Sequence, residues 1–173
     1  GPRGDRIVGG LMAIAGLLMA IPFFGIPFNN TLPALVIIAA CFASHIHRVQ
    51  QIADAGIRNG RKVAFFGRSM HRNTGLAAEL KELDVPQKSV MDIKDLAELP
   101  PSQQLLITTG SQGEPFAALS LMSQGQHKFV ELGEGDTVLI SAKPIPGNET
   151  AVSKVISNLI RRGARVVHGT NAN

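Results

Sequence analysis

The sequence predicts an α/β fold in which helices cover both faces of a mainly parallel sheet, a three-layer arrangement. Short aliphatic runs of strand length alternate with segments whose apolar residues recur at helical spacing. The intervening segments are long enough for a helix that crosses over the sheet, and such crossovers join parallel strands. Loops that leave the carboxyl ends of parallel strands meet at one edge. We therefore expect ligand-binding loops at that edge.

The first half of the alternation starts after Pro33. Leu35–Phe42 is a continuous apolar run, and the helix that follows has one apolar face and ends near Gly60. Lys62–Phe66 predicts the next strand, and the turn at Gly67 leads into a second amphipathic helix. The predicted apolar face of this second helix consists of Leu76, Ala77, Leu80 and Leu83.

The second half repeats the pattern. Ser89–Ile93 and Lys94–Leu99 form a weaker pair of strand and helix. Gln104–Thr108 predicts a strand, which leads through a glycine-containing turn into a helix over Phe116–Met122. The remaining predicted elements are a strand over Thr137–Ser141, a helix with Val152, Val155, Ile156, Leu159 and Ile160 on its apolar face, and a strand over Ala164–His168 after Gly163.

Composition limits the class of protein. The 173 residues fit one domain, and 17 Lys and Arg against 13 Asp and Glu give a net charge of +4, a modest bias toward anionic partners. Trp and Tyr are absent, so any base stacking must come from Phe, His or Arg. The single cysteine, Cys41, cannot form an intrachain disulfide, which favours a reducing compartment. Zinc-binding spacings of Cys and His and a Walker loop are absent from the sequence.

Residues 1–30 differ from the rest of the chain. Ile7–Phe28 carries no charged residue, which suits a membrane-spanning length, yet glycines and prolines interrupt it. Leu11–Ile21, the clearest helical section, is too short to cross a bilayer. Three interpretations stay open: a membrane anchor, a hydrophobic segment packed on the domain, and a non-native leader. We expect an apolar leader over residues 1–30 and one domain over residues 31–173.

The turn Thr109–Pro115 is the strongest candidate for a binding site. It follows a predicted buried strand, and Pro115 suits a first helical turn, so the amides of Gly110 to Glu114 are expected to point outward, unpaired. Such amides bind phosphate well. Glu114 is expected to lie in the first helical turn, directed away from an anion. The alternative is a tight connection between strand and helix with no ligand.

Polar side chains on the other loops of this edge extend the candidate site. Ser44 is a candidate cap of a helix that begins at His45, and His45 and Arg48 would then face the crevice. Arg68 offers a planar fork that can hold phosphate at two points. Each of these residues has a plainer alternative as a cap or a solvated cation. Asn148 is a further candidate N-cap.

Several of these segments together resemble a known family. They are Phe42-Ala43-Ser44-His45-Ile46-His47-Arg48-Val49-Gln50-Gln51, Gly60-Arg61-Lys62-Val63-Ala64-Phe65-Phe66-Gly67-Arg68-Ser69-Met70, the turn Thr109–Pro115, and Ile145-Pro146-Gly147-Asn148-Glu149. In this order they resemble the β-CASP domain of ribonuclease J, a member of the metallo-β-lactamase/β-CASP ribonucleases. The resemblance extends from Ala34 to Asn173.

The resemblance implies a cytoplasmic bacterial enzyme of RNA processing with 5′-to-3′ exonuclease and endonuclease activity. In that family a metallo-β-lactamase domain holds two zinc ions, and RNA runs between it and the β-CASP domain. The 5′-monophosphate pocket of the family is carried over onto Gly110, Ser111, Gln112 and Gly113, with Ser44, His45, Arg48 and Arg68 in support.

The chain also departs from the family. The metal-binding motifs of the β-lactamase half are missing from the sequence, and hydrolysis needs an activated water. We therefore expect no cofactor in this chain, and an RNA-binding portion that is inactive alone. The expected partners are RNA, a metallo-β-lactamase domain and, in the full-length enzyme, further copies of the protein. The alternatives are a small nucleotide or phosphosugar enzyme, and an interaction module anchored to a membrane through Ile7–Phe28.

Overall fold

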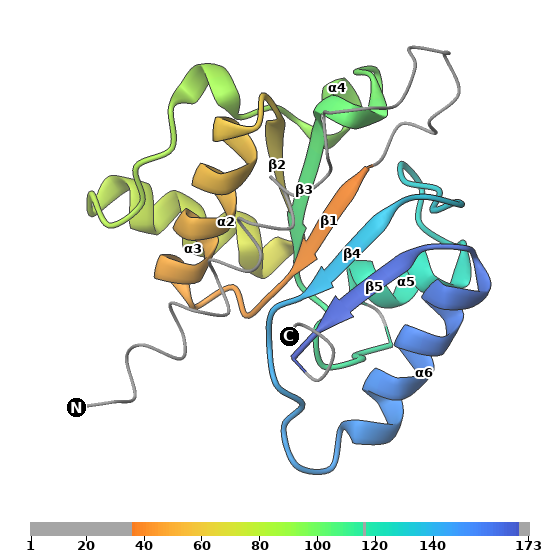
Figure 1. The fold of residues 1–173 in the computed structure, drawn as a ribbon. Coiled ribbons are helices and arrows are strands. Elements are labelled where there is room, and N and C mark those ends of the chain that lie inside the picture. The colour runs from red at the N-terminus through yellow and green to blue at the C-terminus, as the bar shows by residue number, and fades with distance from the viewer. Residues whose placement is uncertain (1–35, 116, 170–173) are drawn as a thin grey trace.

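The computed structural model describes residues 36–115 and 117–169, which form an α/β sandwich around a five-stranded sheet (Figure 1). The strand order is β2-β3-β1-β4-β5, and every pairing in this sheet is parallel. The strands are β1 (Ile37–Ala40), β2 (Lys62–Phe66), β3 (Gln104–Thr108), β4 (Thr137–Ile140) and β5 (Arg165–His168). The predicted fold class is therefore confirmed.

Helices cover both faces of the sheet (Figure 1). One face is covered by α2 (Ile46–Arg58) and α3 (Arg68–Glu79), and the other by α4 (Ile93–Ala97), α5 (Ala118–Gln124) and α6 (Glu149–Arg161). Two short 3₁₀ helices, η1 (Gln87–Ser89) and η2 (Pro101–Gln103), connect α3 to β3 on either side of α4.

Alternating residues of each strand supply two separate cores. Ala39 of β1 packs on the side of α2 and α3, whereas its neighbours Ile38 and Ala40 pack on the side of α4, α5 and α6. All three side chains are fully buried. A parallel sheet that is buried on both faces requires such continuous apolar strands, which is why these runs are recognisable in the sequence.

Two details of the predicted elements are wrong. The run Ser89–Ile93 does not form a strand of the sheet, because only Val90 makes an isolated bridge, to Val63, while Ile93 begins α4. Of the predicted apolar face of the second helix, Ala77 and Leu83 are buried but Leu76 and Leu80 are exposed, and α3 packs through Ala77 together with Met70 and Thr74.

The helix caps also differ from the prediction. His45, not Ser44, is the N-cap of α2, and it makes no side-chain capping bond. Asn148 is the N-cap residue of α6, as predicted, but its side chain makes no capping bond; its carbonyl accepts the N–H of Val152. The cap that does form is that of Asp92, whose carboxylate accepts the N–H of Lys94 at the start of α4.

The apolar segment Ile7–Phe28 and the proposed boundary at residue 30 lie outside the described residues. Across residues 36–115 and 117–169, the helices are all too short or too polar to cross a bilayer.

His127 organises the connection between α5 and β4. Its Nδ1 accepts the backbone N–H groups of Phe129 and Val130 at 3.3 and 3.2 Å, so this nitrogen must be unprotonated. The ring packs edge-on against Phe66 at a centroid distance of 4.8 Å. Burial lowers the pKa of His127 below its ordinary value of 6.5, which favours the same neutral state.

We expect His127 to make folding sensitive to mild acid. Because its pKa is lowered in the folded state, its contribution to the free energy of unfolding is complete above pH 6.5 and is lost as the pH falls below that value. Urea unfolding between pH 7.5 and 5 measures this loss. The His127→Asn variant keeps an acceptor but cannot titrate, and should lose less stability over this interval. If the free energy of unfolding fell equally with pH in both proteins, His127 would not be the cause of the acid sensitivity.

Candidate functional site

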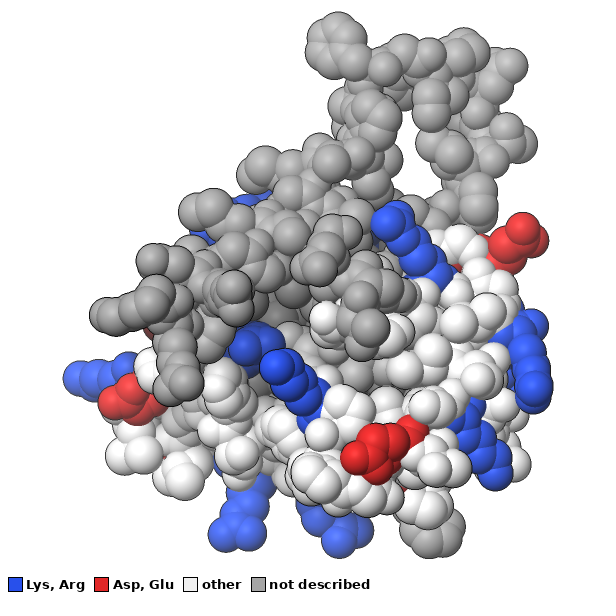
Figure 2. All heavy atoms as spheres, turned by 60° about the horizontal axis from the view of Figure 1, so that its bottom comes forward, with Lys and Arg blue, Asp and Glu red and all other residues white. Residues whose placement is uncertain are grey.

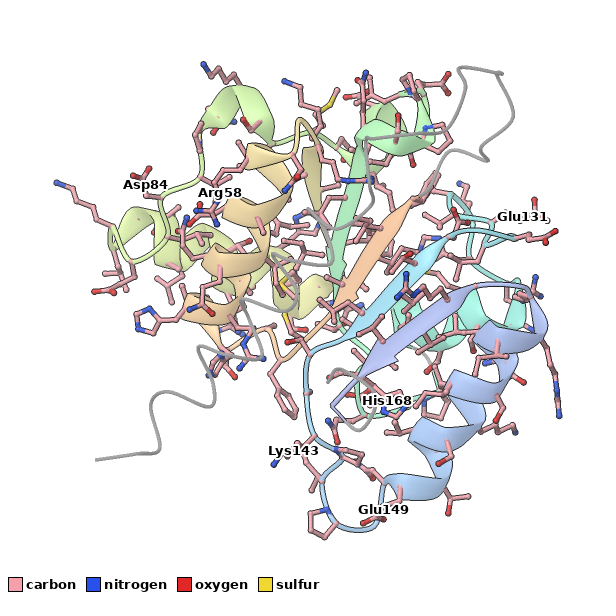
Figure 3. The ribbon with its side chains drawn as sticks, in the orientation of Figure 1. Arg58, Asp84, Glu131, Lys143, Glu149 and His168 are labelled. Carbon is pink, nitrogen blue, oxygen red and sulfur yellow. The ribbon has the colours of Figure 1, made fainter. Side chains whose placement is uncertain are left out.

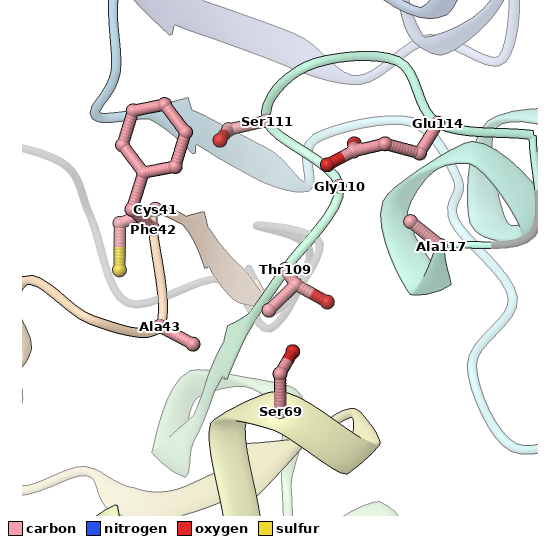
Figure 4. A pocket seen from close by; sticks show the side chains of 9 residues that line it. All are labelled: Cys41, Phe42, Ala43, Ser69, Thr109, Gly110, Ser111, Glu114 and Ala117. Carbon is pink, nitrogen blue, oxygen red and sulfur yellow. The ribbon is translucent and has the colours of Figure 1, made fainter. Parts of the chain in front are cut away.

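A pocket of about 300 Å³ opens at the carboxyl edge of the sheet, between the loops that follow β1 and β3 and the start of α3 (Figure 4). Its position is the one expected for ligands in a parallel α/β sheet. The lining residues are Cys41, Phe42, Ala43, Ser69, Thr109, Gly110, Ser111, Glu114 and Ala117. The predicted glycine turn therefore lines a pocket together with the predicted loops after β1 and β2.

Gly110 shapes the bend because the chain comes close to α5 there. Its φ is +103°, and a Cβ at this position would lie 3.0 Å from the Cβ atoms of both Ala117 and Leu119. Glycine supplies both the left-handed conformation and the missing side chain. The bend that results holds Ser111 with only 3% of its surface exposed, although it lines the pocket.

The amides of the bend are less free than the sequence predicted. The N–H of Gly113 donates to the carbonyl of Gly110 at 3.2 Å, and the N–H of Gln112 donates to the carboxylate of Glu114 at 3.3 Å. Helix α5 begins only at Ala118, so Glu114 precedes the helix instead of lying in its first turn. The expectation that Glu114 points away from the bend is wrong. Its carboxylate already accepts one of the amides predicted for phosphate.

Gln112 joins two loops of this edge. Its side chain is 4% exposed, donates through Nε2 to the carbonyl of Lys143 at 3.1 Å and accepts the N–H of Ile145 through Oε1 at 2.7 Å. Both ends of the amide are thus used between the loops after β3 and β4. Sequence reasoning missed this role, because no local pattern links residues more than thirty positions apart. The bond from Gln112 to Lys143 places Lys143 on the same edge as the pocket (Figure 3).

Arg48 connects α2 to the end of β4. Its guanidinium donates to the hydroxyl of Ser141 at 2.5 Å and to the carbonyl of Ser141 at 3.4 Å. Its Nε is buried and has no hydrogen-bond partner among the described residues. Arg48 therefore lies beside the pocket and braces the sheet edge.

The same guanidinium acts on Cys41, whose side chain is 1% exposed although the residue lines the pocket. Burial raises the pKa of the Cys41 thiol from 9.0 to about 11, and the charge of Arg48 opposes this rise. The thiol is consequently neutral at physiological pH, which suits a structural residue and not a nucleophile.

The other predicted residues lie around the pocket and are exposed. Ser44 and His45 follow the lining residue Ala43, and Arg68 precedes the lining residue Ser69 at the start of α3. The structure thus brings the loops after β1, β2 and β3 together at one edge, as predicted. The binding roles of these side chains stay predictions.

Figure 2 shows the molecule with this edge turned forward. On the coloured part of this view, Lys and Arg side chains are spread around the face and Asp and Glu side chains are fewer. The view agrees with the net charge of +4 and favours an anionic partner.

Across residues 36–115 and 117–169, no group of three or more His, Cys, Asp and Glu side chains lies close enough together to hold a metal ion. The residues described here therefore do not fit the zinc centre that the family resemblance implies for a full-length enzyme.

Comparison with known protein families identifies the family to which the loops of this edge belong. The family described as "Ribonuclease J, beta-CASP domain" matches residues 35–159. The chain belongs to this family. The β-CASP match covers β1 through α6 almost to its end, and thus every loop that lines the pocket.

Named relatives agree with the family match. Ribonuclease J of Mycolicibacterium smegmatis is 53% identical over 136 residues, which cover 79% of this chain and 24% of that protein. Ribonuclease J of Corynebacterium glutamicum is 44% identical over 79% of this chain and 19% of its own length. Ribonuclease J 1 of Streptococcus pyogenes is 45% identical over 77% and 24%. The chain thus spans about a quarter of the length of such relatives or less.

A second family, described as "Exopolysaccharide synthesis, ExoD", matches residues 1–47. The two matches overlap at residues 35–47, which include β1 and the first residues of α2. The apolar leader is therefore similar to a family other than ribonuclease J.

Gly113 should prove essential for the packing of the bend in this β-CASP domain. Its φ is +75°, and a Cβ there would lie 2.6 Å from the carbonyl carbon of Ala151 in α6. We expect Gly113→Ala to lower the free energy of unfolding by about 3 kcal/mol, from backbone strain and collision together. Urea denaturation of the variant measures the loss.

Gly147→Ala is the matched control for Gly113→Ala. Gly147 also has a positive φ, +97°, but nothing lies within 4 Å of its added Cβ. It should lose only about 1 kcal/mol from backbone strain. Equal losses in the two variants would show that contact with α6 does not constrain the bend.

Proposed function

We propose that this chain is the RNA-binding β-CASP portion of a ribonuclease J-like enzyme, and that the pocket receives the 5′-monophosphate of an RNA. The observation that carries the proposal is the pocket at the carboxyl edge, built from the loops after β1 and β3 and the start of α3. The family match supports it, because the matched residues include all of these loops.

The lining of the pocket suits a phosphate. Ser69, Thr109 and Ser111 provide hydroxyl groups that can donate to phosphate oxygens, and Figure 4 shows the side chains of Ser69 and Thr109 turned toward one another. The backbone N–H of Gln112 already donates to an anionic oxygen, which belongs to the carboxylate of Glu114. A phosphate oxygen would take over this bond when the carboxylate swings aside.

The exposed cations around the pocket suit the RNA backbone. Arg68 at the start of α3, Lys143 in the loop after β4 and His45 before α2 lie at the same edge and can approach successive phosphates. Their contribution would not depend on base sequence, and it would weaken as salt increases. Arg48 would act indirectly, by holding the chain at Ser141, since its guanidinium already binds that residue.

Hydrolysis would require groups from elsewhere. Two zinc ions held by a metallo-β-lactamase domain are the cofactors we propose for the full-length enzyme, which would act in the cytoplasm as an exonuclease and endonuclease. That domain, RNA and further copies of the protein are its proposed partners. This chain would supply binding and orientation of the RNA.

Binding of short RNAs that differ only at the 5′ end tests the proposal. We expect the 173-residue chain to bind a 5′-monophosphorylated RNA about tenfold more tightly than the same RNA with a 5′-hydroxyl, because a charge-assisted hydrogen bond adds more than 1 kcal/mol. Fluorescence anisotropy at several salt concentrations measures both affinities. Equal affinity for the two RNAs would exclude the 5′-phosphate pocket, and no binding of either would exclude the RNA-binding function.

Glu114→Gln should increase the affinity for the 5′-phosphorylated RNA by about fivefold. The substitution removes a negative charge from the pocket, and two like charges about 4 Å apart in water repel by about 1 kcal/mol. Affinity for the 5′-hydroxyl RNA should change much less.

Glu149→Gln is the matched control for Glu114→Gln. Each carboxylate accepts the N–H of the residue two positions earlier, Gln112 for Glu114 and Gly147 for Glu149, but Glu149 does not line the pocket. An equal gain of affinity in both variants would reflect net charge alone and would contradict the role of Glu114.

A further inference from the structure

Phe42 is an exposed aromatic residue at the wall of the pocket. Its side chain is 38% exposed, and among the described residues it is the only aromatic among the large exposed apolar side chains. It lines the pocket, and Figure 4 shows the Ser111 side chain directed toward its ring. An aromatic ring that keeps this exposure beside polar hydroxyl groups is available to a ligand.

The backbone around Phe42 is firmly held. Cys41 donates its N–H to the carbonyl of Thr108 at 3.1 Å, which continues the pairing of β1 with β3. The carbonyl of Phe42 accepts the N–H of His45 at 3.1 Å and closes a turn before α2. The backbone that carries the ring is therefore fixed, and only the two side-chain torsions of Phe42 need to be ordered when a ligand binds.

The chemistry beside the ring limits what it can bind. The side of the pocket opposite Phe42 carries the hydroxyl of Ser111 and the Gly110 bend, which suit an oxyanion, whereas the ring offers a flat apolar face. A nucleotide combines these two properties, because its phosphate and its base are joined through a sugar. Stacking on an aromatic side chain accepts any base, since each base has a π-face.

We propose that Phe42 stacks on the first nucleobase of the RNA whose 5′-phosphate occupies the Gly110–Gln112 bend. Phe42 would thereby make the pocket a site for a 5′-terminal nucleotide and not for a phosphate alone. This inference rests on the proposed function, and it adds a residue that determines which 5′ ends bind well. Trp and Tyr are absent from the sequence, so any stacking on a base must come from Phe, His or Arg.

The test uses two 5′-phosphorylated RNAs that are identical except for the first nucleotide, which either carries its base or is abasic. For the 173-residue chain, Phe42→Leu should weaken binding of the base-bearing RNA about tenfold, within the range known for loss of one stacked base. Phe42→Tyr retains the ring and should bind within about twofold of the original chain. All three proteins should bind the abasic RNA equally and weakly.

Leu80→Ala is the control for loss of exposed apolar surface. Leu80 is 64% exposed and directly follows α3, about 18 Å along the helix from Arg68 at the pocket end. This variant should bind both RNAs as the original chain does.

The outcomes separate the two proposals. If Phe42→Leu binds the base-bearing RNA like the original chain, or loses the same affinity for both RNAs, the stacking role is overturned. In either case a retained preference for 5′-phosphate over 5′-hydroxyl would leave the proposed function intact. Loss of that preference in every protein, the original included, would instead overturn the proposed function.

Discussion

The pairing of β1 with both β3 and β4 is the constraint on which the pocket depends. Ala40 stands in register with Thr108 on one side and with Ile140 on the other. Two further bonds, from Cys41 to Thr108 and from Ser141 to Ala40, close the row. Because three strands end at the same level, their loops separate immediately beyond it. The pocket occupies the space between the loops after β1 and β3.

The strands and helices that depend on local patterns of apolar residues could be predicted from the sequence. Buried parallel strands such as Gln104–Thr108 are apolar between their ends, and α2 and α6 carry apolar residues at helical spacing. The prediction of a strand over Ser89–Ile93 was wrong because the apolar residues Val90, Met91 and Ile93 suit a short strand, whereas here Ile93 is buried as the first residue of α4.

The contacts of the candidate site were beyond sequence reasoning for a physical reason. Polar side chains such as Gln112 and Arg48 satisfy partners that only the tertiary fold brings near, namely the backbone of Lys143 and Ile145 and the hydroxyl of Ser141. Burying an amide or guanidinium costs free energy unless the group forms hydrogen bonds. These two side chains therefore bind the neighbouring loops. The loops around the pocket are thereby fixed, while the side chains of Arg68 and Phe42 stay exposed.

The backbone N–H of Gln112 gives a physical reason why this edge would distinguish RNA ends. A buried amide without an acceptor costs about 1 to 3 kcal/mol, and the carboxylate of Glu114 relieves that cost for Gln112. A ligand must therefore replace an anionic acceptor and not merely fill a space. A 5′-hydroxyl offers a neutral oxygen, which makes the weaker hydrogen bond, whereas a phosphate offers an anionic oxygen in exchange. The exchange also removes a carboxylate from beside the incoming charge. On the proposed function, the preference for a phosphorylated end would thus arise from the backbone N–H of Gln112, for which Glu114 and the phosphate compete.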